Sequence, residues 1–254
     1  MLERIDHDAG IRELRLARPP VNALDPGLIR ALREAVETAP RDGAEALLIS
    51  GAPGMFSAGL DVPVLLTLDH AALEPVWRDF FGLAAALACS PIPSVAAITG
   101  HSPAGGAVLA VHCDYRVMAR GSYRIGLNEV QVGLTVPDCI QHALARLVGA
   151  YRAERLLVAG TMLESEAAQA IGFVDELADV EHVVTRAMIW LRELLALPRE
   201  AMRATRVQAR VDLAAVYADP ARLPIQSFLD GWFAPEAQTV LKALVAQLKS
   251  GKSR

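Results

Sequence analysis

The sequence has few cysteines, and its histidines lack the spacing of metal ligands. Its three cysteines, Cys89, Cys113 and Cys139, stand well apart in a chain of 254 residues. An odd number of cysteines without a secretion signal indicates reduced and mostly buried thiols, not a disulfide framework. The six histidines form no metal-type pattern. We therefore expect no metal ion and no redox cofactor.

Blocks of like charge and an unbroken apolar segment are also missing. Lysine and arginine number 25 against 29 aspartates and glutamates, a net charge of −4, and the basic residues are spread along the chain, which argues against a nucleic-acid partner. The most apolar stretch, residues 80–98, is interrupted at 90–94 by SPIPS, whose prolines would break a membrane-spanning helix. The first eight residues, MLERIDHD, are too charged for a signal peptide. We expect a cytoplasmic protein without a membrane partner.

Strand-like and helix-like segments alternate along most of the chain. Hydrophobic residues make up 53% of it, enough for a sizeable core. Apolar patterning predicts strands over 11–16, 44–49, 94–99, 115–119 and 122–126, and helices over 28–36, 70–88 and 105–110. Asp25 is expected to cap the first of these helices, with Pro26 at its first position. From Pro137 onward the signals are helical except for a strand at 173–177. The pattern predicts an α/β core over residues 1–197 and a helical region over 198–254 for packing and oligomerisation.

Two runs of small residues, 56–61 (FSAGLD) and 102–106 (SPAGG), each follow a strand-like stretch and open a predicted helix. The first N–H groups of a helix have no partner within it and can point at a ligand. Two such donors that share one oxygen form an oxyanion hole. Glu129, a lone acid in the apolar segment 125–129 (IGLNE), is the best candidate for a base beside it.

Structural roles compete with these interpretations. Glycine pairs such as Gly105 and Gly106 are more often packing or turn positions. Asp61 is interpreted as a helix cap, and Asp138 as a first-turn helix residue, with a second proton carrier as the alternative. The aromatic residues are expected in the core or an interface first and in an acyl pocket second: Trp77, Phe80, Phe81, Phe228, Trp232 and Phe233.

A serine hydrolase is the rival enzyme class. Residues 100–104 (GHSPA) nearly reproduce the G-x-S-x-G nucleophile elbow. In an elbow the residue after the serine supplies an oxyanion N–H, and Pro103 has none. We therefore expect Ser102 to have a packing or turn role.

Five motifs, in this order, resemble the crotonase (enoyl-CoA hydratase/isomerase) superfamily, and they are most similar to its 3,2-enoyl-CoA isomerase (dodecenoyl-CoA isomerase) branch. The resemblance covers about residues 11–177, with motifs at 19–24 (PPVNAL), 56–61 (FSAGLD), 103–106 (PAGG), 113–116 (CDYR) and 125–129 (IGLNE). It implies a spiral of ββα units, an acyl-CoA substrate with no separate cofactor, and a homotrimer or dimer of trimers. The apolar region around Phe228, Trp232 and Phe233 also favours assembly, since a partner could cover it.

The resemblance assigns roles to individual positions. It implies that the N–H groups of Leu60 and Gly105 hold the thioester oxygen and that Glu129 is the catalytic base. It places the adenine end of CoA near Val21 and Ala58. Acyl-chain length is expected to depend on how Val64, Val108 and Leu134 line the pocket.

Hydratases of this superfamily carry a second glutamate at the position of Val108, so this chain retains one carboxylate. Adding water is easiest with two carboxylates, whereas moving a double bond needs one base. We therefore expect an isomerase that converts 3-enoyl-CoA to trans-2-enoyl-CoA in fatty-acid beta-oxidation through a dienolate. The alternatives are an enoyl-CoA hydratase, another enolate-forming acyl-CoA enzyme, and a non-catalytic CoA-ester binding protein.

Overall fold

The computed structural model describes residues 1–218, 223 and 225–251, and its strands form two sheets. The larger sheet has the order β1-β2-β3-β5-β7-β10 and the smaller one β4-β6-β8-β9. In the larger sheet the strands are β1 (Leu2–Asp6), β2 (Ile11–Leu16), β3 (Ala46–Ser50), β5 (Ser94–Ile98), β7 (Tyr115–Ala119) and β10 (Glu176–Ala178). In the smaller sheet they are β4 (Gly54–Met55), β6 (Gly100–Pro103), β8 (Arg124–Gly126) and β9 (Leu163–Glu164).

A repeated unit connects the two sheets. Strands β3, β5 and β7 of the larger sheet are each followed after a short turn by β4, β6 and β8 of the smaller one. Neighbours β3 and β5, β5 and β7, β4 and β6, and β6 and β8 are all parallel, so the chain must cross back through helices between them. This is the predicted spiral of ββα units, and the α/β fold class is confirmed.

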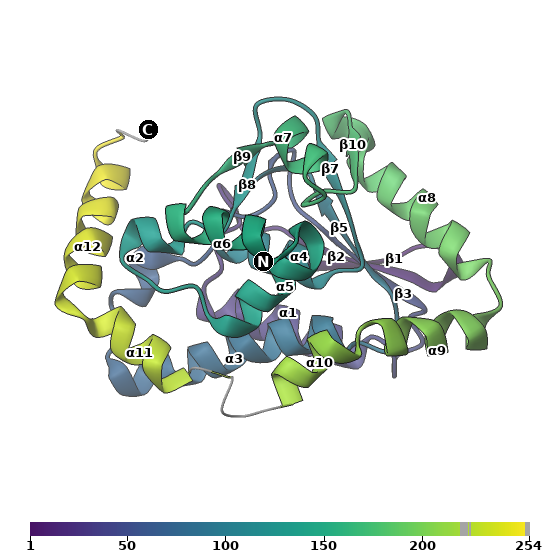
Figure 1. The fold of residues 1–254 in the computed structure, drawn as a ribbon, viewed down its shortest axis with the longest axis horizontal. Coiled ribbons are helices and arrows are strands. Elements are labelled where there is room, and N and C mark those ends of the chain that lie inside the picture. The colour runs from purple at the N-terminus through teal and green to yellow at the C-terminus, as the bar shows by residue number, and fades with distance from the viewer. Residues whose placement is uncertain (219–222, 224, 252–254) are drawn as a thin grey trace.

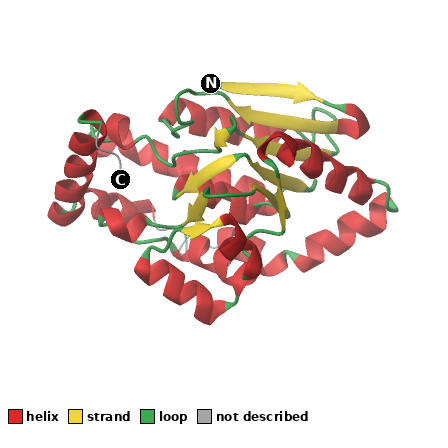
Figure 2. Cartoon of the chain, turned by 90° about the horizontal axis from the view of Figure 1, so that it is seen from above, coloured by secondary structure: helices red, strands yellow, loops and turns green. Residues whose placement is uncertain are grey.

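Helices surround the strands (Figure 2). In the first part of the chain they are α1 (Pro26–Thr38), α2 (Val62–Leu65), α3 (His70–Cys89), α4 (Gly105–His112), α5 (Asp138–Val148), α6 (Ala150–Ala159), α7 (Ser165–Ala170) and α8 (Val183–Leu195). The last part consists of α9 (Arg199–Ala209), α10 (Val211–Ala218), α11 (Ile225–Phe233) and α12 (Pro235–Lys249). Short 3-10 turns are η1 (Asp8–Gly10), η2 (Glu129–Val132) and η3 (Val180–His182). Figure 1 shows α8 and α9 on one side of the molecule and α11 and α12 on the opposite side.

The central strands β3 and β5 are buried throughout and mostly apolar because both faces of the larger sheet are covered. Every residue of β3 and β5 is buried. One face packs into the main core with α1, α3 and α4, and the other packs on α8 through Val183, Ala187 and Leu191. Continuous apolar runs of this kind are typical of parallel strands between two helical layers.

Most predicted elements are confirmed, and the differences have local causes. As predicted, helix α1 begins at Pro26, and the Asp25 carboxylate caps it by accepting a hydrogen bond from the Leu28 N–H at 2.7 Å. Strands β1, β4, β6 and β9 are not predicted, since β1 is a largely exposed edge strand and β4 and β9 have two residues each. The strand expected at 173–177 lies instead at Glu176–Ala178. Phe173 and Val174 end the turn after α7, where both N–H groups donate to the Ala168 carbonyl.

The apolar stretch 80–98 divides as the prolines predict. Helix α3 ends at Cys89, and β5 begins at Ser94. Among the helices of the described residues, none combines the length and the apolar character that a membrane span requires. All three cysteines are free, with Cys113 and Cys139 buried and Cys89 exposed.

The aromatic residues of α11 pack on α3 of the same chain. The ring of Trp77 lies edge-on to Phe228 at 4.9 Å and to Trp232 at 5.3 Å between centroids, and the latter two are buried. Phe233 is 37% exposed and stacks on His70. The expectation that a partner covers this region is therefore wrong for Phe228 and Trp232, because α3 already covers them. The trimer remains a prediction.

A buried carboxylate attaches the C-terminal helices to the core. Asp114, just before β7, accepts hydrogen bonds from the Ser94 N–H at 2.8 Å, from Arg206 Nε and Nη2 at 2.9 Å each, and from Arg210 Nη1 at 3.0 Å. Burial alone would raise the pKa of Asp114, but the charges of Arg210 and Arg206 hold it below its usual value. One carboxyl group thus binds both Arg206 of α9 and Arg210 at the α9–α10 junction to the start of β7.

We expect Asp114→Asn to lower the free energy of unfolding by about 3 kcal/mol, because it leaves two largely buried guanidinium groups without their counter-charge. Asp212→Asn is the matched control, since Asp212 pairs with Arg146 at 2.9 Å while its side chain is 50% exposed, and such pairs contribute about 1 kcal/mol or less. Urea unfolding monitored by circular dichroism measures both. Equal effects of the two substitutions would contradict the role given to Asp114.

Candidate functional site

Backbone hydrogen bonds pair the loop that follows β4 with the segment before α1. The Ala58 N–H donates to the Val21 carbonyl at 2.9 Å, so these two predicted CoA-contacting residues lie side by side. Leu24 N–H donates to the Gly59 carbonyl at 2.7 Å, and Asp61 N–H donates to the Leu24 carbonyl at 3.0 Å. This pairing occupies the Gly59 carbonyl and the Asp61 N–H, which flank Leu60, but leaves the Leu60 N–H unused. That N–H points to the other side, and it has no acceptor among the described residues.

Helix α4 begins directly against this loop. A Cβ atom on Gly59 would lie 3.1 Å from the Gly105 nitrogen, one on Gly105 would lie 3.4 Å from the Leu60 nitrogen, and one on Gly106 would lie 2.8 Å from the Ser57 carbonyl oxygen. The three glycines therefore allow two backbone segments to approach at a distance that side chains would prevent. Within the described chain the Gly105 N–H also has no acceptor. The structure thus brings the predicted donors Leu60 and Gly105 together at the N-terminus of a helix.

Ala104, the residue before α4, has a strained backbone. Its φ is 44° and its ψ is −115°, in a region that non-glycine residues rarely adopt and that costs on the order of 1–3 kcal/mol. The Ala104 N–H donates to the Gly126 carbonyl at 2.8 Å. This bond ties the start of α4 to the end of β8, from which the chain continues to Glu129.

Glu129 is the first residue of η2 and is 8% exposed. Its Oε2 atom is buried and has no hydrogen-bond partner in the part of the chain that the structure describes. Burial raises the pKa of Glu129 from its ordinary value of 4.5 to about 7, and its own backbone N–H opposes this only slightly. A carboxylate with a pKa near neutrality is suited to take up and return a proton.

The acyl-pocket candidates divide into two groups. Val108 and Leu134 are buried in the main core, and Leu60 packs against the same cluster. Val64 is partly exposed in α2, where its N–H donates to the Asp61 carboxylate at 3.1 Å. Asp61 is thus a helix cap, as predicted, and it also pairs with Arg18 at 2.6 Å.

Helix α4 is fixed at its C-terminal end through a buried histidine. Burial lowers the pKa of His112 to about 4, so the ring is neutral near pH 7. Its Nδ1 donates to the Val108 carbonyl at 2.6 Å, which leaves Nε2 to accept from the Tyr217 hydroxyl at 2.5 Å. His112 therefore has a structural role that connects α4 to α10.

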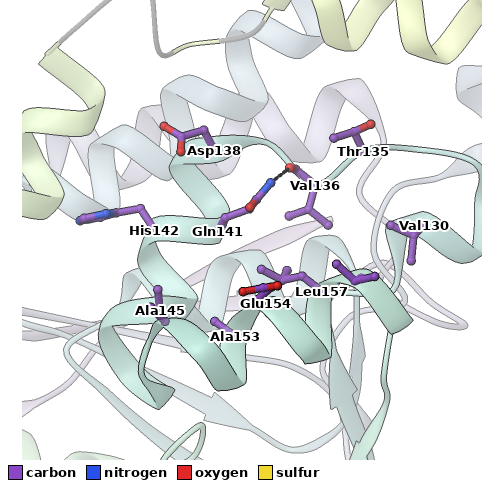
Figure 3. A pocket seen from close by; sticks show the side chains of 12 residues that line it. Val130, Thr135, Val136, Asp138, Gln141, His142, Ala145, Ala153, Glu154 and Leu157 are labelled. Atoms are coloured by element: carbon purple, nitrogen blue, oxygen red, sulfur yellow. Dashed lines mark hydrogen bonds between the residues drawn. The ribbon is translucent and has the colours of Figure 1, made fainter.

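Asp138 lies in a groove between α5 and α6 (Figure 3). The groove has a volume of about 470 Å³ and is lined by side chains that include Val130, Asp138, His142, Glu154 and Leu157. Asp138 begins α5 and is exposed, as expected of a first-turn helix residue. Glu129 is not among the residues that line this groove.

The serine of the elbow-like motif is buried without a base. Ser102 in β6 is fully buried, and its Oγ has no hydrogen-bond partner within residues 1–218, 223 and 225–251. An activated serine requires a base within hydrogen-bond reach, so the geometry counts against a serine hydrolase. Over the same residues, no group of three histidine, cysteine, aspartate or glutamate side chains is placed to hold a metal ion.

We compared the chain with known protein families and solved structures, and the result agrees with the motifs and with the geometry of the site. A sequence profile described as Enoyl-CoA hydratase/isomerase matches residues 6–223. The chain belongs to the enoyl-CoA hydratase/isomerase family. The resemblance predicted from the sequence motifs is thereby confirmed.

Relatives within the enoyl-CoA hydratase/isomerase family have names of both kinds. Human enoyl-CoA delta isomerase 1, mitochondrial, is 30% identical over 97% of this chain and 83% of its own length. The crystal structure of human mitochondrial delta3-delta2-enoyl-CoA isomerase matches with a TM-score of 0.93 at 29% identity and covers 99% of both chains. Probable enoyl-CoA hydratase echA17 of Mycobacterium avium is 35% identical over 84% of this chain and 81% of its own length.

One residue of this family member's site has a role that sequence reasoning did not assign. Asn22 lies in the motif at 19–24 and has a φ of 49°. Its side chain accepts a hydrogen bond from the Arg18 N–H at 2.8 Å and donates to the Phe56 carbonyl at 3.1 Å. The Asn22 side chain therefore fixes the start of the 56–61 loop against the segment before α1. The available signal is that asparagine tolerates positive φ better than most residues.

The raised pKa of Glu129 predicts how stability varies with pH. The folded protein holds this proton at pH values where the unfolded chain has released it, so the stabilisation is complete below pH 4.5 and is lost as the pH rises through about 7. Over that range we expect the wild-type protein to lose about 3 kcal/mol of unfolding free energy relative to Glu129→Gln. Urea unfolding at a series of pH values measures the difference. Glu154→Gln, at an exposed position of α6, is the control and should parallel the wild type. If the unfolding free energy of Glu129→Gln varied with pH as that of the wild type does, the raised pKa assigned to Glu129 would be wrong.

Proposed function

We propose that the protein isomerises 3-enoyl-CoA thioesters to trans-2-enoyl-CoA, with Glu129 as the base that removes a proton from the α carbon and returns it at the γ carbon. The observation that supports this is the buried carboxyl group of Glu129, whose pKa is raised to about 7. Glu129 follows β8, and the Ala104 N–H ties β8 to the start of α4, where the two free backbone donors lie. The substrate supplies its own CoA, so the reaction needs no separate cofactor.

The dienolate intermediate carries its charge on the thioester oxygen. In this proposal the N–H groups of Leu60 and Gly105 bind that oxygen, assisted by the positive end of the α4 dipole. One such donor contributes about 3 kcal/mol to transition-state stabilisation, on the order of 10²-fold in rate. Val21 and Ala58 would contact the adenine end of CoA, and Val64, Val108 and Leu134 the acyl chain.

Val108 favours isomerisation over hydration. Hydratases of the family carry a glutamate at this position, where two carboxylates can hold and activate a water molecule. Here the side chain is an isopropyl group that is 1% exposed. A dry, apolar wall leaves the dienolate to be protonated by Glu129 alone.

Enoyl-CoA hydration is the second candidate function, because some relatives such as that of Mycobacterium avium are named probable hydratases. A non-catalytic CoA-ester binding protein is less favoured. Burying a carboxyl group without a partner costs stability, and a protein that only binds a thioester has no need of it.

Location and assembly are also proposals. We propose a cytoplasmic location, whereas the names of the human and mouse relatives place those proteins in mitochondria. We also retain the homotrimer or dimer of trimers. Exposed apolar residues that a partner could cover lie on α6 and at the α9–α10 junction, namely Tyr151, Val158, Val207 and Val211.

We expect Glu129→Gln to lower isomerisation about 10²-fold or more while folding and CoA-ester binding persist, because glutamine keeps the shape and cannot accept the proton. In the wild type, kcat/KM should rise with pH and level off above about 7, since only ionised Glu129 removes the proton. Steady-state kinetics with a 3-enoyl-CoA thioester, with Glu154→Gln as control, measures both. A variant that retains more than about a tenth of wild-type turnover would refute the assignment.

The wild-type protein should hydrate trans-2-enoyl-CoA far more slowly than it isomerises 3-enoyl-CoA of the same chain length. Val108→Glu should increase hydration, because it restores the second carboxylate, although the buried acid will partly retain its proton. Val108→Gln is the matched control, since it is polar at the same length but cannot ionise. Separation of the thioester products by chromatography measures both rates. Wild-type hydration equal to or faster than isomerisation would favour the hydratase alternative.

A further inference from the structure

The turn that carries Glu129 is held from two sides. Helices α6 and α12 both contact η2, and α12 also contacts α2, which directly follows Leu60 and Asp61. Figure 1 shows α12 beside α2 at the end of the molecule opposite α8. The last helix of the chain therefore connects the segment that carries the candidate base with the segment that carries a candidate oxyanion donor.

Contact with α6 involves the side chains of η2. A Cβ atom on Gly160 would lie 2.8 Å from Val130 Cγ2 and 3.0 Å from Gln131 Cγ. Gln131 Nε2 donates to the Gly160 carbonyl at 2.8 Å. The nearest backbone atom on this side, the Cα of Asn128, would lie 3.5 Å from the same Cβ position, an ordinary van der Waals distance. This side therefore constrains the Glu129 backbone less closely than the contact with α12 described next.

Contact with α12 involves the backbone itself. Gly133 ends η2 with a φ of 76°, and its N–H points at the carbonyls of Glu129 and Val130. The Leu134 N–H donates to the Glu129 carbonyl at 3.1 Å. A Cβ atom on Gly133 would lie 3.0 Å from the Cα and 3.3 Å from the nitrogen of Ala237, in the first turn of α12. We call this the Gly133–Ala237 contact.

Helix α12 is anchored independently of this contact. Gln238 Nε2 donates to the Trp232 carbonyl at 2.8 Å, and Trp232 is buried against Trp77 of α3. Ala237 and Leu241 are both fully buried. The position of α12 is thus set by the core, and the Gly133–Ala237 contact transmits it to the turn of Glu129.

We propose that Ala237 is a positioning residue for Glu129: its contact with Gly133 fixes the turn that carries the base and keeps water away from the carboxyl group. This inference rests on the proposed function. Ala237 itself touches no substrate in this account. A larger residue at 237 has no free space, so it would displace α12 from Gly133 and admit water to the Glu129 carboxyl group.

Charged side chains on the neighbouring helices do not explain the raised pKa of Glu129. The charged side chains of the two helices packed against η2 are all exposed: Glu236, Lys242 and Lys249 on α12, and Arg152, Glu154 and Arg155 on α6. Burial is the main cause of the raised pKa of Glu129. A variant that admits water should therefore lower this pKa toward 4.5.

The test compares Ala237→Leu with Ala243→Leu, the same change at an exposed position of the same helix. Ala237→Leu should lower kcat by about 10- to 10²-fold above pH 7, where Glu129 is ionised in both proteins, because a displaced base loses its alignment. KM should change little, and the acidic midpoint of kcat/KM should move below the wild-type value. Ala243→Leu should behave as the wild type, and Ala237→Gly, which keeps the backbone contact, should retain the wild-type midpoint. Gly133→Ala, which disturbs the same contact from the other side, should reproduce the Ala237→Leu pattern.

An unchanged midpoint together with a kcat equal to that of Ala243→Leu would overturn the inference. Where Ala237→Leu does not fold, Ala237→Val and Gly133→Ala decide by the same criteria. Failure of all three to fold while Ala243→Leu folds would make the contact a requirement of the fold alone, which also overturns the inference. If Glu129→Gln remains active, the proposed function itself is wrong. If Glu129→Gln is inactive and the Ala237 variants behave as the wild type, only the positioning role is wrong.

Discussion

Close approach of two backbone segments without intervening Cβ atoms is the constraint on which the site depends. The loop at 56–61 and the start of α4 meet through Gly59, Gly105 and Gly106, and this contact aligns two N–H groups that neither segment could offer alone. The same contact forces Ala104 into a strained conformation. The strain persists because the Ala104 N–H is bonded to β8, so one arrangement of the backbone positions both the donor pair and the strand that leads to Glu129.

Burial of the Glu129 carboxyl group is the second constraint, and it opposes stability. A buried carboxylate in which one oxygen has no hydrogen-bond partner, as Oε2 of Glu129 has none among the described residues, is disfavoured by its lost hydration. The protein tolerates this because η2 lies between α6 and α12, which close around it. The cost and the proposed activity have the same origin, since exclusion of water is what brings the pKa of the carboxyl group close to neutral pH.

Features fixed by local sequence could be predicted, and features that depend on distant contacts could not. The Asp25 cap, the break between α3 and β5, and free N–H groups at the two runs of small residues follow from residue types within a few positions. The choice of Leu60 and Gly105 as the donors came from the family resemblance. By contrast, the covering of Trp232 by α3 joins residues far apart in the chain. The Gly133–Ala237 contact likewise could not be predicted from the sequence, because neither a glycine nor an alanine indicates which distant residue it will contact. Asp114 lies in the motif at 113–116, but nothing near it in the sequence indicates that it pairs with Arg206 and Arg210.

From the attachment of α9 and α10 to Asp114 we also expect an order of assembly. Asp114 and its guanidinium partners are separated by 92 and 96 positions in the chain, so this junction closes only after the strands around β7 have formed a surface. Contacts of such long range form late in folding, because the chain between them must first be ordered. During synthesis the core segment leaves the ribosome before the helices that dock on it. We therefore expect the nascent chain to pass through a stage in which the spiral is largely built while the turn of Glu129 is still open to water. If α12 positions this turn as proposed, the carboxyl group acquires its raised pKa only when the last helix is in place.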